Sequence, residues 1–165
     1  MTDRTDPDFC LRPAEPGDYP FALALYLVSA KEHLTRIGRW DEDRFATLFR
    51  EGYNQGQTRI ICVGGRIVGF IQVVDFADRL YLRQLHLIDG FRRRGIGSTL
   101  ICAELKRGVE TGRPVTLDVM HGNPARRLYV RLGFESTGKD PDKEQMIWRR
   151  RRTRDSANLT GAMDS

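Results

Sequence analysis

Apolar residues recur along the chain with two different periods, one typical of strands and one typical of helices. Alternate apolar positions indicate a half-buried strand, and apolar residues at i, i+3, i+4 and i+7 indicate an amphipathic helix. Asp18 and Asp41 stand where a side chain can cap the first two helices. Strands are predicted at residues 9–13, 59–63, 67–74, 80–88, 115–120, 134–137 and 145–149, and helices at residues 20–34, 41–52, 96–112 and 125–132.

Two neighbouring strands in the middle of the chain form the clearest predicted hairpin. Residues 59–63 and 67–74 are both apolar, and Gly64 and Gly65 lie between them. Two glycines favour the tight turns that connect antiparallel strands, because those turns need positive φ angles.

The next predicted strand, residues 80–88, has an irregular pattern. Leu80, Leu82 and Leu85 are its apolar positions, and the alternation breaks at residues 85–88. This break predicts either a β-bulge there or a strand that is buried on both faces.

The order of the elements, β-α-α-β-β-β-α-β-α-β-β, predicts an α/β fold with a mixed sheet and helices on both of its faces. A chain of 165 residues suits one domain. We expect a disordered N-terminus over residues 1–8, a domain over 9–149, and a tail over 150–165 that is basic, then polar and disordered. No apolar run reaches the roughly 20 residues that a membrane helix needs.

The positive charge of the chain is concentrated in two places. The net charge is +5, and the segment 149–165, with five arginines and two aspartates, contributes +3 of it. The rest of the chain is +2, and without Arg92, Arg93 and Arg94 it would be −1, so the remaining surface is close to neutral and does not indicate a nucleic-acid-binding protein. Three widely spaced cysteines and three scattered histidines predict no disulfide framework, no metal site and a reducing, cytoplasmic location.

The segment 85–100 carries the most informative chemistry. It predicts a strand, a loop with Gly95 and Gly97, and the start of a helix, where free N–H groups and the helix dipole favour an anion such as a diphosphate. Leu100 stands where the third glycine of a dinucleotide-binding fingerprint belongs, and no Gly-Lys-Ser/Thr of a P-loop follows. A tight strand-to-helix turn would explain the two glycines equally well.

A second informative segment spans residues 123–134. Asn123 is suited to cap a short helix, whose leucines belong to the core and which Gly133 ends. Tyr129 lies on this helix but need not belong to its leucine stripe, so its phenol is free to point into a cleft.

Together, the two segments resemble the GCN5-related N-acetyltransferase (GNAT) superfamily. The family signature Arg/Gln-x-x-Gly-x-Gly/Ala is matched by Arg92, Gly95 and Gly97. A second family pattern is matched by Asn123, Leu128-Tyr129 and Gly133-Phe134, with Ala125 one position earlier than the family's alanine. The resemblance implies a GNAT-type mixed, mostly antiparallel twisted sheet, and acetyl-CoA as co-substrate. The acetyl-CoA-binding residues that it implies are Leu85, His86, Leu87, Arg92, Arg93, Arg94, Gly95, Ile96, Gly97, Ser98, Asn123 and Tyr129.

The resemblance also implies three catalytic positions. The N–H of Leu87 would stabilise the oxyanion of the thioester, and Tyr129 would protonate the departing thiolate. Asp118 matches the position of a catalytic base in some members, although an outward-facing polar residue of an alternating strand is the alternative. His86 is a second candidate base, because the unperturbed pKa of histidine is suitable, or else a packed histidine.

The acceptor side is predicted at Glu32, Tyr81, Gln84 and His86. The expected enzyme is an N-acetyltransferase that moves an acetyl group to a primary amine, on a small molecule or peptide, by direct attack in a ternary complex. The alternative is a GNAT-fold module that binds acyl-CoA or regulates a partner without turnover. We expect no membrane partner, and a homodimer is left open.

Overall fold

The computed structural model describes residues 7–151, which form a seven-stranded sheet and four α-helices. Every predicted strand and helix is present, and the predicted fold class is confirmed. The ends 1–8 and 150–165 are predicted to be disordered, and most of their residues, 1–6 and 152–165, lie outside the described residues. The strands are β1 (Cys10–Pro13), β2 (Thr58–Val63), β3 (Arg66–Asp75), β4 (Leu80–Leu87), β5 (Val115–Met120), β6 (Glu135–Lys139) and β7 (Lys143–Trp148), and the helices are α1 (Tyr19–Arg36), α2 (Glu42–Gly52), α3 (Ile96–Thr111) and α4 (Ala125–Leu132).

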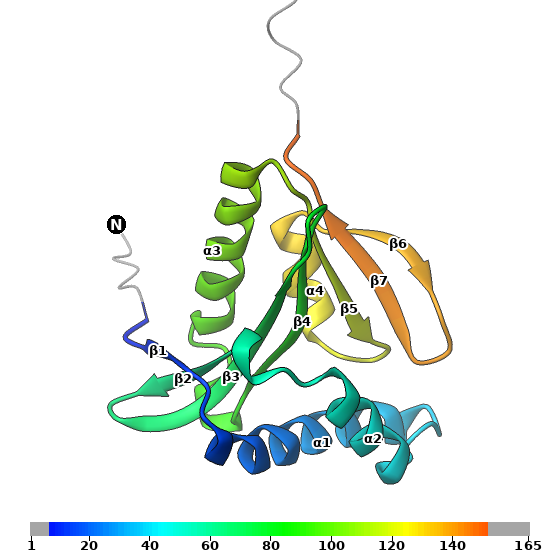
Figure 1. Cartoon of the computed structure of the whole chain (residues 1–165). Helices are drawn as coiled ribbons and strands as arrows, with labels where there is room; N and C mark the ends of the chain where they lie inside the picture. Colours follow the sequence, from blue (N-terminus) through cyan, green and yellow to red (C-terminus); the bar gives the residue numbers. More distant parts are fainter. Residues whose placement is uncertain (1–6, 152–165) are drawn as a thin grey trace, which may run out of the picture.

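The sheet separates two hydrophobic cores. Its strand order is β1-β2-β3-β4-β5-β7-β6, and every neighbouring pair is antiparallel except β4 with β5. Figure 1 shows α1 and α2 together on one side of the sheet and α3 and α4 on the other. Phe45, Phe49 and Phe70 belong to the first core, and Ile101 and Leu117 belong to the second.

Local sequence features determine where these elements begin and turn. The Asp41 side chain accepts a hydrogen bond of 3.0 Å from the Arg44 N–H, so it caps α2 as predicted. The predicted cap by Asp18 is wrong, because its carboxylate accepts hydrogen bonds from Arg12 and makes none to the start of α1. Gly64 and Gly65 have φ angles of 56° and 78° and form the turn between β2 and β3. Side chains other than glycine rarely adopt two successive angles of this kind.

The bulge of β4 lies at Arg83, earlier than the predicted position at residues 85–88. Gln72 of β3 faces Gln84, whereas the next residue, Val73, faces Leu82, so Arg83 is the extra residue. The physical reason is visible in the leucine spacing: Leu80 and Leu82 pack into the α3–α4 core, and so do Leu85 and Leu87. An extra residue between the two pairs keeps all four leucines on one face.

β4 and β5 separate soon after they meet. Their parallel pairing covers only Leu80–Leu82 of β4 and Val115–Leu117 of β5. Both strands continue further, β4 to Leu87 and β5 to Met120, and Figure 1 shows them diverging. This divergence opens the sheet at its centre. Among the described residues, no helix is long and apolar enough to cross a membrane.

Candidate active site

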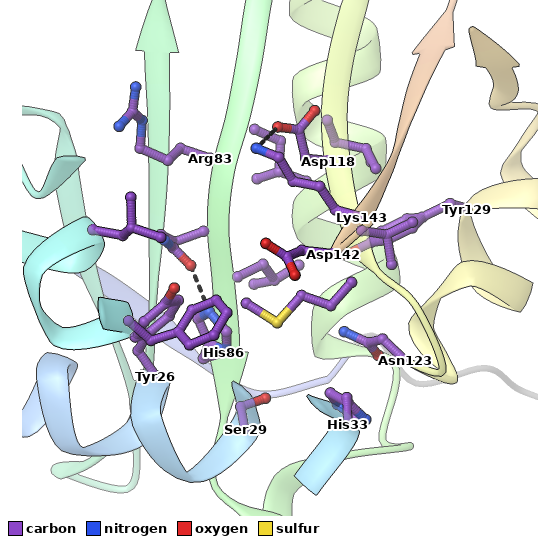
Figure 2. Close-up of a pocket in the computed structure, with 18 of the residues that line it drawn as sticks. Tyr26, Ser29, His33, Arg83, His86, Asp118, Asn123, Tyr129, Asp142 and Lys143 are labelled. Atoms are coloured by element: carbon purple, nitrogen blue, oxygen red, sulfur yellow. Dashed lines mark hydrogen bonds and ion pairs between the residues drawn. The ribbon is translucent and has the colours of Figure 1, made fainter. Parts of the chain in front are cut away.

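A cavity of about 250 Å³ lies where β4 and β5 diverge. Its walls come from α1, α2, β4, β5, α4 and the turn between β6 and β7 (Figure 2). Residues that the sequence predicts for the site and that line this cavity are Tyr81, Gln84, Leu85, His86, Asp118, Asn123 and Tyr129. Glu32, Leu87 and the segment 92–98 are not part of its wall.

The backbone of Leu87 faces the opening between β4 and β5. The N–H of the following residue, Ile88, donates a 2.8 Å hydrogen bond to the Val68 carbonyl in β3. Because successive N–H groups of a strand point to opposite sides, the N–H of Leu87 points away from β3. The Leu87 carbonyl, on that same side, accepts a 3.0 Å hydrogen bond from Arg92 Nε.

The segment 92–98 forms the start of α3. Arg93 and Gly95 have positive φ angles of 62° and 84°, and the first intrahelical hydrogen bond runs from the Thr99 N–H to the Gly95 carbonyl over 3.0 Å. The N–H groups of residues 96–98 therefore have no hydrogen-bond partner within the helix. A Cβ added at Gly97 would meet only Leu85 Cδ2, at 3.9 Å, so there is open space beside these donors. The segment fits a diphosphate.

The arginines of this segment differ in their contacts. Arg92 lies 3.3 Å from Asp89 and 3.8 Å from Glu32, so Glu32 lies beside the β4–α3 loop and not in the cavity wall. Arg93 and Arg94 are exposed, and the Arg94 guanidinium lies 4.8 Å from the centroid of the Phe91 ring. Their charges remain available to an anion at the helix start.

Asn123 and Tyr129 both line the α4 side of the cavity (Figure 2). Asn123 Oδ1 accepts a 2.9 Å hydrogen bond from the Ala125 N–H, which leaves its amide group to donate. The Tyr129 ring is buried and packs edge to face against Phe134, with centroids 5.8 Å apart. Burial raises the pKa of Tyr129 to about 12, so its hydroxyl stays protonated at neutral pH.

Asp118 turns its carboxylate toward the cavity and is held there by two donors. The Tyr81 hydroxyl donates to Oδ2 over 3.0 Å, and Lys143 Nζ donates to the same oxygen. Among the described residues, no donor lies within hydrogen-bond distance of Oδ1. Burial and the neighbouring Asp118 raise the pKa of Tyr81, so Tyr81 acts as a neutral donor.

His86 and Gln84 lie on the face of β4 that α1 covers. His86 Nε2 and Gln84 Oε1 are 2.7 Å apart, so the ring N–H donates to the amide oxygen. The imidazole packs edge to face against Tyr26 at 5.8 Å. Burial, with the charge of Arg92 and the nearby His33, lowers the pKa of His86 to about 3, so His86 is neutral at neutral pH.

The sequence did not predict the wall that the β6–β7 turn provides. Asp142 lines the cavity and forms ion pairs with Arg39 and Arg44, which are about 100 residues away in the chain. Lys143, its neighbour, binds Asp118. His33 of α1 also lines the cavity; it is buried, and burial lowers the pKa of its imidazole. The one sequence signal for this wall is the polar stretch 138–144 between the last two predicted strands.

A sheet that opens between two parallel strands, beside a helix start that fits a diphosphate, is consistent with the acetyl-CoA site that the GNAT resemblance implies. The chain matches the model of the acetyltransferase (GNAT) family over residues 24–134, and it belongs to this family. The resemblance seen in the sequence and the predicted enzyme class, an N-acetyltransferase, are therefore confirmed. The comparison with curated proteins gave no match.

Several solved structures share the fold. The PaiA N-acetyltransferase of Thermoplasma acidophilum, in complex with coenzyme A, is 19% identical with a TM-score of 0.67, covering 86% of this chain and 98% of that one. Ard1 of Thermoplasma volcanium is 24% identical with a TM-score of 0.62, covering 85% of this chain and 96% of that one. N-acetylglutamate synthase of Neisseria gonorrhoeae, with coenzyme A and N-acetyl-glutamate, is 15% identical with a TM-score of 0.62, covering 90% of this chain and 36% of that one.

Proposed function

We propose that this protein transfers the acetyl group of acetyl-CoA to a primary amine by direct attack in a ternary complex. The observation that supports the proposal is the opening between β4 and β5, which holds the cavity. Leu85 of the cavity wall lies 3.9 Å from a Cβ built at Gly97, so the diphosphate-fitting segment 92–98 adjoins the opening. The reducing, cytoplasmic location belongs to the proposal and rests on the number and spacing of the cysteines in the sequence.

On the cofactor side, backbone groups have the main role. The N–H groups of residues 96–98, with Arg93 and Arg94 nearby, hold the diphosphate, and the Asn123 amide contacts the pantetheine arm. The Leu87 N–H donates to the thioester carbonyl and to the oxyanion that forms from it. One such donor is worth about 2.7–4 kcal/mol in the transition state.

On the acceptor side, Asp118 is the group we assign as the general base. An amine at neutral pH is mostly protonated and must lose a proton before it attacks. Oδ1 of Asp118 is available to take that proton, because both protein donors bind Oδ2. His86 is the second candidate, but its Nε2–H donates to Gln84 Oε1 and its ring packs against Tyr26.

Tyr129 completes the proposed site at the leaving group. Its neutral hydroxyl lines the cavity and donates a hydrogen bond to the sulfur as the carbon–sulfur bond breaks. The carbon–nitrogen bond forms on the Asp118 side, and the thiolate leaves on the Tyr129 side.

The proposal is tested by CoA release from acetyl-CoA, measured with a panel of primary amines and without amine. We expect release that depends on the amine, together with binding of acetyl-CoA to the free enzyme by calorimetry. Binding without release for any amine would contradict the proposal and support the acyl-CoA-binding module instead. Absence of acetyl-CoA binding at millimolar concentration would remove the cofactor assignment.

A further inference from the structure

Arg83, the extra residue at the β4 bulge, has a guanidinium group that no part of the proposed mechanism uses. It lines the same cavity as Asp118 and lies over the Tyr81 ring, with Cζ 5.5 Å from the centroid. Its Nε is buried without a hydrogen-bond partner. Among the described residues, no carboxylate lies within 4.0 Å of its nitrogens. A guanidinium cannot lose its charge, so this partly buried group is available to an anion.

The position of Arg83 is fixed by its neighbours. The end of its side chain lies against Gly52, the last residue of α2, so closely that a Cβ added there would collide with Nη1. The bulge itself directs Arg83 out of the regular alternation of β4. The guanidinium is therefore held at the rim of the cavity by packing and not by an ion pair.

The other charges around the cavity compensate one another. Lys143 pairs with Asp118, while Arg39 and Arg44 share Asp142. The nearby Asp140 accepts hydrogen bonds from the N–H groups of Asp142 and Lys143. In the cavity wall itself, Arg83 and Lys143 stand against Asp118 and Asp142. Both carboxylates already have cationic partners, so Arg83 is the cation of this wall that has no carboxylate partner among the described residues.

We propose that the amine acceptor is an amino carboxylate, whose carboxylate group binds the Arg83 guanidinium. This inference rests on the proposed acetyl transfer to an amine. A planar guanidinium binds a carboxylate through two parallel hydrogen bonds, which orients the acceptor as well as binding it. The carboxylate would also give the Arg83 guanidinium the counter-ion that it lacks among the described residues, and it would place the acceptor amine in the same cavity as Asp118.

Two variants separate the carboxylate site from the rest of the enzyme. Arg83→Gln removes the charge but keeps polar atoms. Gly52→Ala keeps the charge and displaces the guanidinium, because its new Cβ occupies the space of Nη1. Gly17→Ala is the matched control, since a Cβ at Gly17 meets nothing within 4 Å and Gly17 does not line the cavity.

The test is kcat/KM for CoA release with matched acceptor pairs: alanine, β-alanine, 4-aminobutyrate and phenylalanine, each beside its own carboxamide. We expect the wild-type enzyme to prefer the carboxylate of at least one pair by about tenfold or more. Arg83→Gln and Gly52→Ala should lower that preference at least fivefold, by reducing turnover of the carboxylate much more than that of the amide, and Gly17→Ala should leave it unchanged.

The outcomes distinguish the two levels of the proposal. Turnover of the carboxamides with no preference for any carboxylate would overturn the inference and leave the proposed function intact. A carboxylate preference that Arg83→Gln does not reduce would overturn the assignment of Arg83. If no CoA is released with either member of any pair, this inference is overturned. That result counts against the proposed function only if no other primary amine is acetylated.

Discussion

Replacing Tyr129 by phenylalanine separates the effect of its hydroxyl group from that of its ring. The ring is buried and packs against Phe134, and a phenylalanine ring fills the same space. We expect the fold to be retained with a melting temperature within a few degrees of the wild type, since about 1 kcal/mol corresponds to roughly 2–4 °C in a domain of this size.

The expected loss of rate follows from two pKa values. Burial raises the pKa of Tyr129 to about 12. A thiol leaving group has a pKa of about 8.5, so complete proton transfer from the phenol to the thiolate is unfavourable by about 5 kcal/mol. Tyr129 is therefore expected to stabilise the thiolate as a hydrogen-bond donor. Such a bond to a charged group is worth about 1.5–3 kcal/mol, so Tyr129→Phe should lower kcat about 10- to 150-fold.

The assay is CoA release at saturating acetyl-CoA and amine, with the Kd of acetyl-CoA measured separately. The Kd should stay within about twofold of the wild type, because the hydroxyl acts only as the thiolate forms. Tyr19→Phe is the matched control, since Tyr19 does not line the cavity. Unchanged kcat would refute the role of the hydroxyl, and a loss confined to Kd would make it a ground-state binding group.

Four further predictions concern the base, the cofactor segment, acid stability and the tail. Asp118→Asn should lower kcat about 10²- to 10⁴-fold, which is the usual contribution of a general base. The exposed control Asp75→Asn should leave kcat unchanged, and equal kcat values for the Asp118→Asn variant and the wild type would reject the assignment. Gly97→Leu should weaken acetyl-CoA binding at least tenfold without unfolding the protein, because its side chain enters the space beside the α3 donors; calorimetry checks this, and wild-type affinity would contradict it. The ion pair with Arg126 lowers the pKa of Glu144 to about 2. The stability that this pair contributes is therefore complete above the unfolded pKa near 4.5 and is lost as the pH falls toward about 2. Glu144→Gln should remove that part of the acid dependence of the melting temperature. Deleting residues 150–165 should leave the Kd of acetyl-CoA unchanged if residues 9–149 form the functional unit, and a weaker Kd would show that the tail contributes to the cofactor site.

Local sequence features were sufficient to predict the elements of the fold. Asp41 caps α2 and the Gly64-Gly65 pair forms the turn because each acts on residues beside it in the chain. The bulge was predicted in the correct strand but too late, although the interval from Leu82 to Leu85 marks its place. The extra residue keeps the four leucines on one face, and the three-residue interval between Leu82 and Leu85 indicates it.

The cavity was only partly predictable, because its remaining groups meet through tertiary contacts. Asp118, which the family resemblance singled out, lines the cavity, but its partner Lys143 comes from β7. Asp142 is paired with Arg39 across more than a hundred residues, and no local pattern indicates that pairing. The absence of a partner for Arg83 among the described residues depends on the packing of α2 and β4, so it becomes visible only in three dimensions.

The most direct test of direct attack in a ternary complex is a grid of initial velocities of CoA release, with acetyl-CoA and the amine varied together. A ternary complex gives double-reciprocal lines that intersect, and the enzyme mixed with acetyl-CoA alone keeps its unmodified mass. Parallel lines, with an acetyl group attached to the enzyme in the absence of amine, would show a covalent intermediate and contradict the account.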